Sequence, residues 1–251
     1  MVKKRIIPIL LLHEGRMIKT IRFDAYRDVG NPVTTARIYQ AQRADELLFL
    51  DITASVQERN ILFDIVREVS QECFMPLGVG GGLRSVEDIR AILSAGADKV
   101  VINTAALEQD GFIEAAARRF GSSTIVVSID VKQHPNGAYE VYTRRAAHAT
   151  GKDPVHWARE AVARGAGEIL ITRADLDGTM QGLDTALIEK TARAVDVPVI
   201  ASGGVGALDD FKHAFDAGAS AVGAGSIFHF TDQNIIKTRK FLWNAGVPVR
   251  P

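Results

Sequence analysis

The sequence contains two copies of one half. Gly80-Gly81-Gly82 closes an apolar run, and a matching run closes with Ser202-Gly203-Gly204, 122 residues later. The match continues downstream at the same offset, where Asn103-Thr104 stands opposite Gly225-Ser226. A chain duplicated in this way is expected to fold as two similar halves.

Eight short runs of apolar and β-branched residues alternate with helical patterns along the chain. This alternation is typical of α/β folds built from βα units, and eight units in 251 residues predict a single (β/α)8 TIM barrel that spans residues 1–251 as one domain. The predicted strands are Arg5–Leu11, Leu47–Asp51, Pro76–Val79, Lys99–Ile102, Thr124–Asp130, Glu168–Thr172, Pro198–Ala201 and Ala221–Gly223. The predicted helices include Pro32–Gln42, Glu58–Gln71, Val86–Ser94, Gly111–Arg119, Pro154–Arg164, Thr185–Val195, Leu208–Asp216 and Asn234–Asn244.

The glycine clusters predict two phosphate sites, one in each half. Glycine lets backbone N–H groups approach an anion, and the N-terminus of a following helix adds a favourable field. The alternative is that the glycines only form tight strand-to-helix turns. Loops after the strands carry the chemistry of such barrels, so we expect the binding residues there: Asp51, Gly81, Gly82, Asn103, Thr104, Thr172, Asp177, Gly178, Gly203, Gly204, Gly225 and Ser226.

A polar stretch, His13–Asn31, follows the first predicted strand and is interpreted as a mobile flap. Its Lys19 could reach over a bound phosphate, although a solvated surface lysine is the alternative. After the fifth strand, His134–Gly137 predicts the turn of a β-hairpin.

Asp130 closes the fifth predicted strand. A carboxylate at this rim is costly to desolvate unless it is paired or used, so it is a candidate general acid or base; pairing with Lys132 is the alternative. When the first strands of the two halves are aligned, Ile6–Leu11 falls on Ile125–Asp130. Leu11 is therefore the partner of Asp130, and a chemistry that needs one carboxylate from each half would have lost one.

Charged residues stand at the opposite ends of four strands. Arg5 and Lys99 open the first and fourth strands, while Glu46 and Glu168 stand at the entrances of the second and sixth. They are expected to form a neutral charged layer at the bottom of the barrel, and a purely structural ring of salt bridges is the alternative.

Composition narrows the choice of partners. Thirty basic and thirty acidic residues cancel, so no overall field favours nucleic acid or a membrane surface. The single cysteine, Cys73, is interpreted as buried and fits a reduced, cytoplasmic setting. Ile6–Leu12 is too short to span a bilayer. We expect a small phosphorylated substrate, no cofactor and no metal.

Eight motifs then occur together over essentially the whole chain: Arg5–Pro8, Asp45–Leu47, Leu50–Ser55, Val79–Gly82, Ala95–Val100, Gly165–Leu170, Asp177–Thr179 and Pro198–Gly204. In this order and spacing they resemble HisF, the family of cyclase subunits of imidazole glycerol phosphate synthase.

The resemblance implies a barrel that docks a HisH-type glutaminase subunit on its N-terminal face and conducts ammonia through its centre. It implies use of that ammonia at the C-terminal face, on a ribulosyl bisphosphorylated aminoimidazole carboxamide in histidine biosynthesis. Asp130 would be the remaining acid or base, Asp51 and Asp177 would orient hydroxyls, and Lys19 would close over a phosphate. Asp98 would contact the glutaminase. The implied ammonia gate is Arg5, Glu46, Lys99 and Glu168, and the implied phosphate residues are Gly81, Gly82, Asn103 and Thr104 at one end and Asp177, Gly178, Gly203, Gly204, Gly225 and Ser226 at the other.

The chain departs from the family at three places. Leu11 stands where the second catalytic aspartate belongs, and His13 stands where a neighbouring lysine of the loop after the first strand is usual. Arg145-Ala146-Ala147 stands where a small residue, glycine and a basic residue are common. The Leu10–Leu12 run with Lys19-Thr20 is similar to a divergent HisF-like branch. In that branch, the barrel and its glutaminase supply ammonia to a sugar amidotransferase that makes an acetamidino sugar for surface polysaccharide. A related isomerase on the same doubled barrel is a third hypothesis, but it also needs the missing aspartate.

Overall fold

A computed structural model describes residues 2–52 and 56–250. Residues 53–55, which end one of the resemblance motifs, lie outside the described residues. In the described residues, eight parallel strands follow one another around a barrel, and β7 pairs with β10 to close it. The predicted fold class is therefore confirmed. The barrel strands are β1 (Arg5–His13), β4 (Leu47–Asp51), β5 (Leu77–Gly80), β6 (Lys99–Ile102), β7 (Ile125–Gln133), β10 (Glu168–Arg173), β11 (Val199–Ser202) and β12 (Ala221–Ala224).

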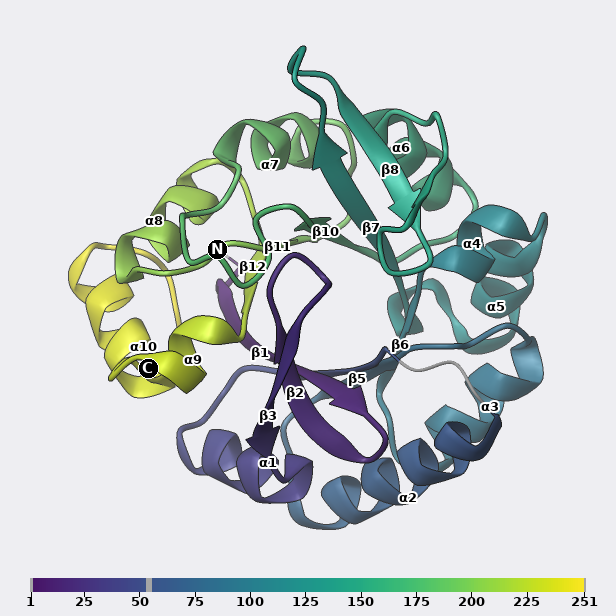
Figure 1. Cartoon of the computed structure of the whole chain (residues 1–251), viewed down its shortest axis with the longest axis horizontal. Helices are drawn as coiled ribbons and strands as arrows, with labels where there is room; N and C mark the ends of the chain where they lie inside the picture. The colour runs from purple at the N-terminus through teal and green to yellow at the C-terminus, as the bar shows by residue number, and fades with distance from the viewer. Residues whose placement is uncertain (1, 53–55, 251) are drawn as a thin grey trace.

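Helices surround the strands (Figure 1). Several begin where the sequence supplies a cap: the Asn31 side chain accepts from Thr34 N before a proline, and Asp153 accepts from His156 N in the same way. The helices are α1 (Pro32–Ala41), α2 (Val56–Glu72), α3 (Val86–Ser94), α4 (Thr104–Glu108), α5 (Phe112–Phe120), α6 (Pro154–Ala163), α7 (Thr185–Ala192), α8 (Leu208–Asp216), α9 (Ser226–Phe230) and α10 (Ile235–Asn244), with a 3-10 turn at Ser122–Thr124.

The core has two layers. An outer layer packs between strands and helices, and it includes Cys73, which is buried as predicted. A smaller cluster fills the barrel itself, because alternate residues of each strand point inward. Its members are Ile7, Ile9, Leu11, Ile18, Leu48, Val101, Val126, Leu170, Ile200 and Ala221.

The duplication is visible in the element bounds. The bounds of β5, α3, β6 and α4 match those of β11, α8, β12 and α9, each shifted by 122 positions. Asp88 Oδ2 accepts from the backbone N–H groups of Arg84 and Ser85, and Asp210 accepts from Gly206 and Ala207 in the same way. These N-terminal donors of α3 and α8 are thus used inside the fold. The short helices α4 and α9, which the sequence pattern did not predict, begin at Thr104 and Ser226 without a side-chain cap.

The stretch predicted as a mobile flap forms a β-hairpin. Strands β2 (Arg16–Thr20) and β3 (Tyr26–Gly30) pair with each other, and β2 also pairs with β1. In Figure 1 this purple hairpin lies across the barrel. The hairpin predicted after the fifth strand is present: β8 (Tyr139–Thr143) pairs with β7 and with β9 (His148–Ala149).

Candidate active site

Asp130 lies at the carboxyl end of the barrel and is 6% exposed. Its Oδ2 accepts a hydrogen bond from Asn103 Nδ2 at 2.8 Å. Lys132 donates instead to the carbonyl of Ala146 at 2.6 Å and lies over the ring of Tyr142. The alternative that Lys132 pairs with Asp130 is therefore wrong.

The surroundings of Asp130 raise its pKa. Burial is the main cause and the charge of Asp177 adds to it, while the hydrogen bond from Asn103 opposes them, and the pKa is raised to about 7. A carboxyl group that titrates near neutrality can both donate and accept a proton at the pH of the cell.

This pKa predicts that stability falls as the pH rises from about 4 to about 7. The folded state holds the proton of Asp130 more tightly than the unfolded chain, so the destabilisation is absent below the unfolded pKa and complete above the folded one. A shift of about three units corresponds to roughly 4 kcal/mol. Denaturant unfolding of the protein and of Asp130→Asn between pH 4 and pH 8 measures it. The variant should lack this part of the fall in the free energy of unfolding with pH. An equal fall in both proteins would contradict the prediction.

Leu11 occupies the position equivalent to Asp130 in the other half. Leu11 pairs with Leu50 of β4, whereas Asp130 pairs with Thr172 of β10, and Leu50 and Thr172 are themselves 122 residues apart. The strand register thus confirms the alignment of the halves. Leu11 is 8% exposed and belongs to the apolar cluster inside the barrel.

Two cavities lie at the carboxyl ends of the strands. We call them the first-half cavity, of about 690 Å³, and the second-half cavity, of about 60 Å³. Five residues line both: Leu11, Phe23, Leu50, Ser128 and Asp130. The two cavities therefore meet at the candidate acid or base. Of the predicted binding residues, the first contains Asp51, Gly81, Gly82, Asn103 and Thr104, and the second contains Lys19, Thr172, Asp177, Gly178, Gly203, Gly204, Gly225 and Ser226.

Packing alone requires glycine at Gly81 and Gly203. Both have a positive φ, and a Cβ at Gly81 would lie 2.0 Å from the carbonyl oxygen of Asp51. A Cβ at Gly203 would lie 2.5 Å from the carbonyl oxygen of Arg173, the equivalent place in the other half. The tight-turn alternative accounts for these two glycines whether or not a phosphate binds.

We predict that Gly81→Ala lowers the free energy of unfolding by about 3 kcal/mol or more, because backbone strain adds to overpacking. Gly137→Ala is the matched control, since Gly137 also has a positive φ but a Cβ added there would meet no atom within 4 Å. The control should cost only about 1–2 kcal/mol. Chemical denaturation compares the two, and equal losses would show that the close approach to Asp51 costs nothing.

Lys19 lies inside the second-half cavity rather than on the surface. Its side chain is 6% exposed, and its Nζ lies 3.2 Å and 3.4 Å from the two carboxylate oxygens of Asp177. Thr20 Oγ1 donates to Asp177 at 3.1 Å, and Arg22 N donates to the Asp177 carbonyl at 2.8 Å. These contacts hold the β2–β3 hairpin against the loop after β10. The surface-lysine alternative is wrong.

A second turn reaches the first-half cavity from β8. Arg144 N donates to Thr104 Oγ1 at 3.2 Å, and the Arg144 guanidinium pairs with Glu108 at 3.2 Å. Arg145 Nη2 lies 3.4 Å from the carbonyl oxygen of Phe23 in the β2–β3 hairpin. The two hairpins therefore touch beside this cavity.

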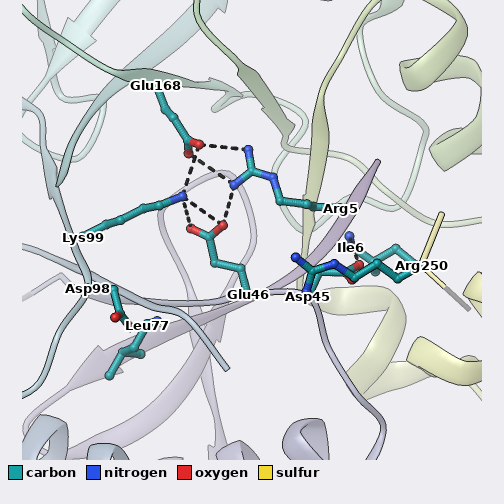
Figure 2. A network of polar contacts seen from close by, with 9 residues as sticks. All are labelled: Arg5, Ile6, Asp45, Glu46, Leu77, Asp98, Lys99, Glu168 and Arg250. Atoms are coloured by element: carbon teal, nitrogen blue, oxygen red, sulfur yellow. Dashed lines mark hydrogen bonds and ion pairs between the residues drawn. The ribbon is translucent and has the colours of Figure 1, made fainter. Parts of the chain in front are cut away.

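At the other end of the barrel, the four predicted charged residues form one network (Figure 2). Arg5 lies 2.5 Å from Glu46 and 3.1 Å from Glu168, and Lys99 lies 3.1 Å from each of the same two carboxylates. Burial alone would lower the pKa of Arg5, but Glu168 and Glu46 outweigh it and raise that pKa. We call these four residues the charged ring. Its two positive and two negative charges cancel.

Two further aspartates lie near the charged ring in Figure 2. Asp98 is exposed, and one of its oxygens accepts from Leu77 N at 2.8 Å. Asp45 is buried, accepts from Ile6 N at 2.8 Å and lies 3.7 Å from Arg250. Asp45 thus has a structural role, whereas the other side of the Asp98 carboxylate faces solvent.

Some residues that line the cavities were not predicted from the sequence. Ser128 stands two positions before Asp130 and so faces the same side of β7, which is a usable signal. No sequence pattern marked Phe23 or Arg84 as a cavity residue. Phe23 lies in a polar stretch, and Arg84 follows a glycine turn. Among the described residues, no group of three or more His, Cys, Asp or Glu side chains is placed to hold a metal. No helix in the described ranges is long and apolar enough to cross a bilayer.

Comparison with known families adds one finding. A family model described as "Histidine biosynthesis protein" matches residues 5–234. The matched range includes the charged ring, both cavities and Asp130. With this match over most of its length, the chain belongs to the histidine biosynthesis protein family.

Proposed function

We propose that the protein is a HisF-type subunit of a glutamine amidotransferase. It receives ammonia from a glutaminase subunit through the barrel and uses it at the carboxyl ends of the strands. Members of its family are typically isomerases or cyclases. The observation that favours the cyclase type is the charged ring, because an isomerase that works at the carboxyl ends of the strands has no use for four paired charges at the opposite end of the barrel.

The interior of the barrel suits ammonia. Between the charged ring and Asp130 lie apolar side chains, among them Ile7, Leu48 and Val101. Uncharged ammonia enters such surroundings at little cost, whereas ammonium would lose its hydration without compensation. The ring is the point at which ammonia leaves the polar entrance, with Lys99 positioned between both glutamates.

The two cavities suit a substrate with a phosphate at each end. Asp130 sits where they meet and acts as general acid or base, while Asp51 orients a hydroxyl. Lys19 serves the second phosphate by exchanging Asp177 for it, since the lysine already lies beside Gly225. Asp98, exposed on the N-terminal face, contacts the glutaminase.

Leu11 favours a second candidate function. An isobutyl group transfers no proton, and loss of a general acid or base typically costs about two to four orders of magnitude in rate. In this alternative the barrel retains the charged ring but passes its ammonia to a sugar amidotransferase that makes an acetamidino sugar.

The test is an assay with the bisphosphorylated ribulosyl substrate and a HisH-type glutaminase, run once with glutamine and once with ammonium salt. Product from both nitrogen sources is expected for the cyclase. Product from neither would contradict it. Stimulation of glutamine hydrolysis by the barrel without cyclisation would favour ammonia delivery to another enzyme.

A further inference from the structure

The two halves place their hairpins in equivalent ways. Strand β1 lies beside β12 and continues into β2, and β7 lies beside β6 and continues into β8. Each hairpin therefore begins next to a strand that leads into one of the short helices, α9 or α4. A residue of β2 that serves the second-half cavity should have a counterpart near β8 that serves the first-half cavity.

The register identifies that counterpart. Leu11 pairs with Ile18, and Asp130 pairs with Tyr142. Because Leu11 and Asp130 are equivalent, the next residues, Lys19 and Thr143, are equivalent too. Thr143 is 1% exposed and does not line the first-half cavity. The lysine of one half thus has no cationic match at the same position in the other.

Two arginines directly after Thr143 do line the first-half cavity. Arg144 is already paired with Glu108 through two contacts of 3.2 Å. Arg145 is exposed, and in the described part of the chain its guanidinium makes a single polar contact, the long one of 3.4 Å to the Phe23 carbonyl. Of the two, Arg145 has less to lose by turning toward a ligand.

The backbone holds Arg145 in an uncommon conformation. Arg144, Arg145 and Ala146 have φ values of 53°, 59° and 57°, three consecutive left-handed residues without a glycine. A left-handed residue other than glycine costs about 1–2 kcal/mol, and strain of this kind gathers at ligand-binding sites. The first-half cavity is also the larger one, at about 690 Å³ against about 60 Å³ where Lys19 is already packed inside.

We propose that Arg145 is the cationic arm of the first-half phosphate site. It leaves the Phe23 carbonyl and binds the phosphate held near Gly81 and Thr104, as Lys19 does in the second half. This inference rests on the proposed function, because it assumes one phosphate site in each half. In this proposal, the first-half site selects phosphate through the planar guanidinium of Arg145, because a guanidinium binds phosphate through two parallel hydrogen bonds.

The experiment is a calorimetric titration of the full chain with inorganic phosphate. The unsubstituted protein should bind two phosphates. Arg145→Asn should weaken one of the two sites by about tenfold, the effect of losing a charge-assisted contact, and asparagine tolerates the left-handed backbone. Lys19→Ala should weaken the other site, and the combined variant should show both losses independently.

Controls separate the side chain from the fold. Arg145→Lys keeps the charge but not the planar fork, so it should recover only part of the tenfold loss. Arg144→Ala should change each site by less than threefold, and the exposed Arg118→Asn should change neither. Two sites unchanged within twofold in Arg145→Asn, or loss of a site in Arg144→Ala alone, would overturn the assignment to Arg145. Absence of any phosphate binding by the unsubstituted protein would overturn the phosphate sites of the proposed function as well.

Discussion

Replacing Leu11 with aspartate should raise ammonium-dependent cyclase turnover by about two to four orders of magnitude, the usual contribution of a general acid or base. Leu11 lines both cavities together with Asp130 and holds the equivalent register position. A carboxylate there would restore one acid–base group from each half. Ammonium salt as nitrogen source removes the need for a glutaminase in this measurement.

Leu11→Asn is the matched control, because an amide has nearly the size and polarity of the carboxyl group but transfers no proton. It should remain near the level of the unsubstituted protein. Turnover of the unsubstituted protein within about tenfold of Leu11→Asp would contradict the prediction and would mean that this cyclase works with leucine. Activity in Leu11→Asp alone would mean that the scaffold is intact and that its cyclase step was given up for ammonia delivery.

Lys99→Ala should uncouple glutamine hydrolysis from ammonia use. Lys99 binds both Glu46 and Glu168, so its removal leaves Arg5 alone to balance two carboxylates that are 2% and 10% exposed. We expect product formed with glutamine to fall at least about tenfold per glutamine hydrolysed, and turnover with ammonium salt to stay within about threefold. Loss of one partner from a partly buried ion network also lowers the free energy of unfolding, here by roughly 2–4 kcal/mol.

The measurement compares product and glutamate in the assembled complex. Arg193→Ala is the control, because Arg193 is 80% exposed and pairs with Glu189 on the outer surface. Unchanged coupling in Lys99→Ala would refute passage of ammonia through the charged ring. A variant that has lost activity with ammonium salt as well would point to a folding defect, which the unfolding curve identifies.

The barrel and the charged ring were predictable because they depend on repeated local patterns. Short apolar strands alternate with amphipathic helices. Arg5, Lys99 and Glu168 each open a strand and Glu46 directly precedes one, so closure of the barrel brings the four together. The equivalence of Leu11 and Asp130 also followed from alignment of the halves.

The surroundings of Lys19 and Arg145 were not predictable in this way. The β2–β3 hairpin is short, and both faces of β2 are buried: Met17 packs in the outer layer of the core and Ile18 packs inside the barrel. No long alternation of apolar and polar residues therefore marks the strand. Arg145 takes a left-handed conformation that glycine normally signals, and its position beside Phe23 depends on two hairpins from distant parts of the chain.

The matched strand registers mean that the two halves share one arrangement of strands at the carboxyl end of the barrel. A recombinant chain that fused two copies of the second half would place an aspartate at both equivalent positions, those of Leu11 and Asp130, but it would omit Arg5 and Lys99. Conversely, a fusion of two first halves would keep both cations of the charged ring and would place leucine at both equivalent positions at the carboxyl end of the barrel. The carboxylate of Asp130 and the two cations of the charged ring are thus divided between the halves: Asp130 belongs to the second half, and Arg5 and Lys99 belong to the first.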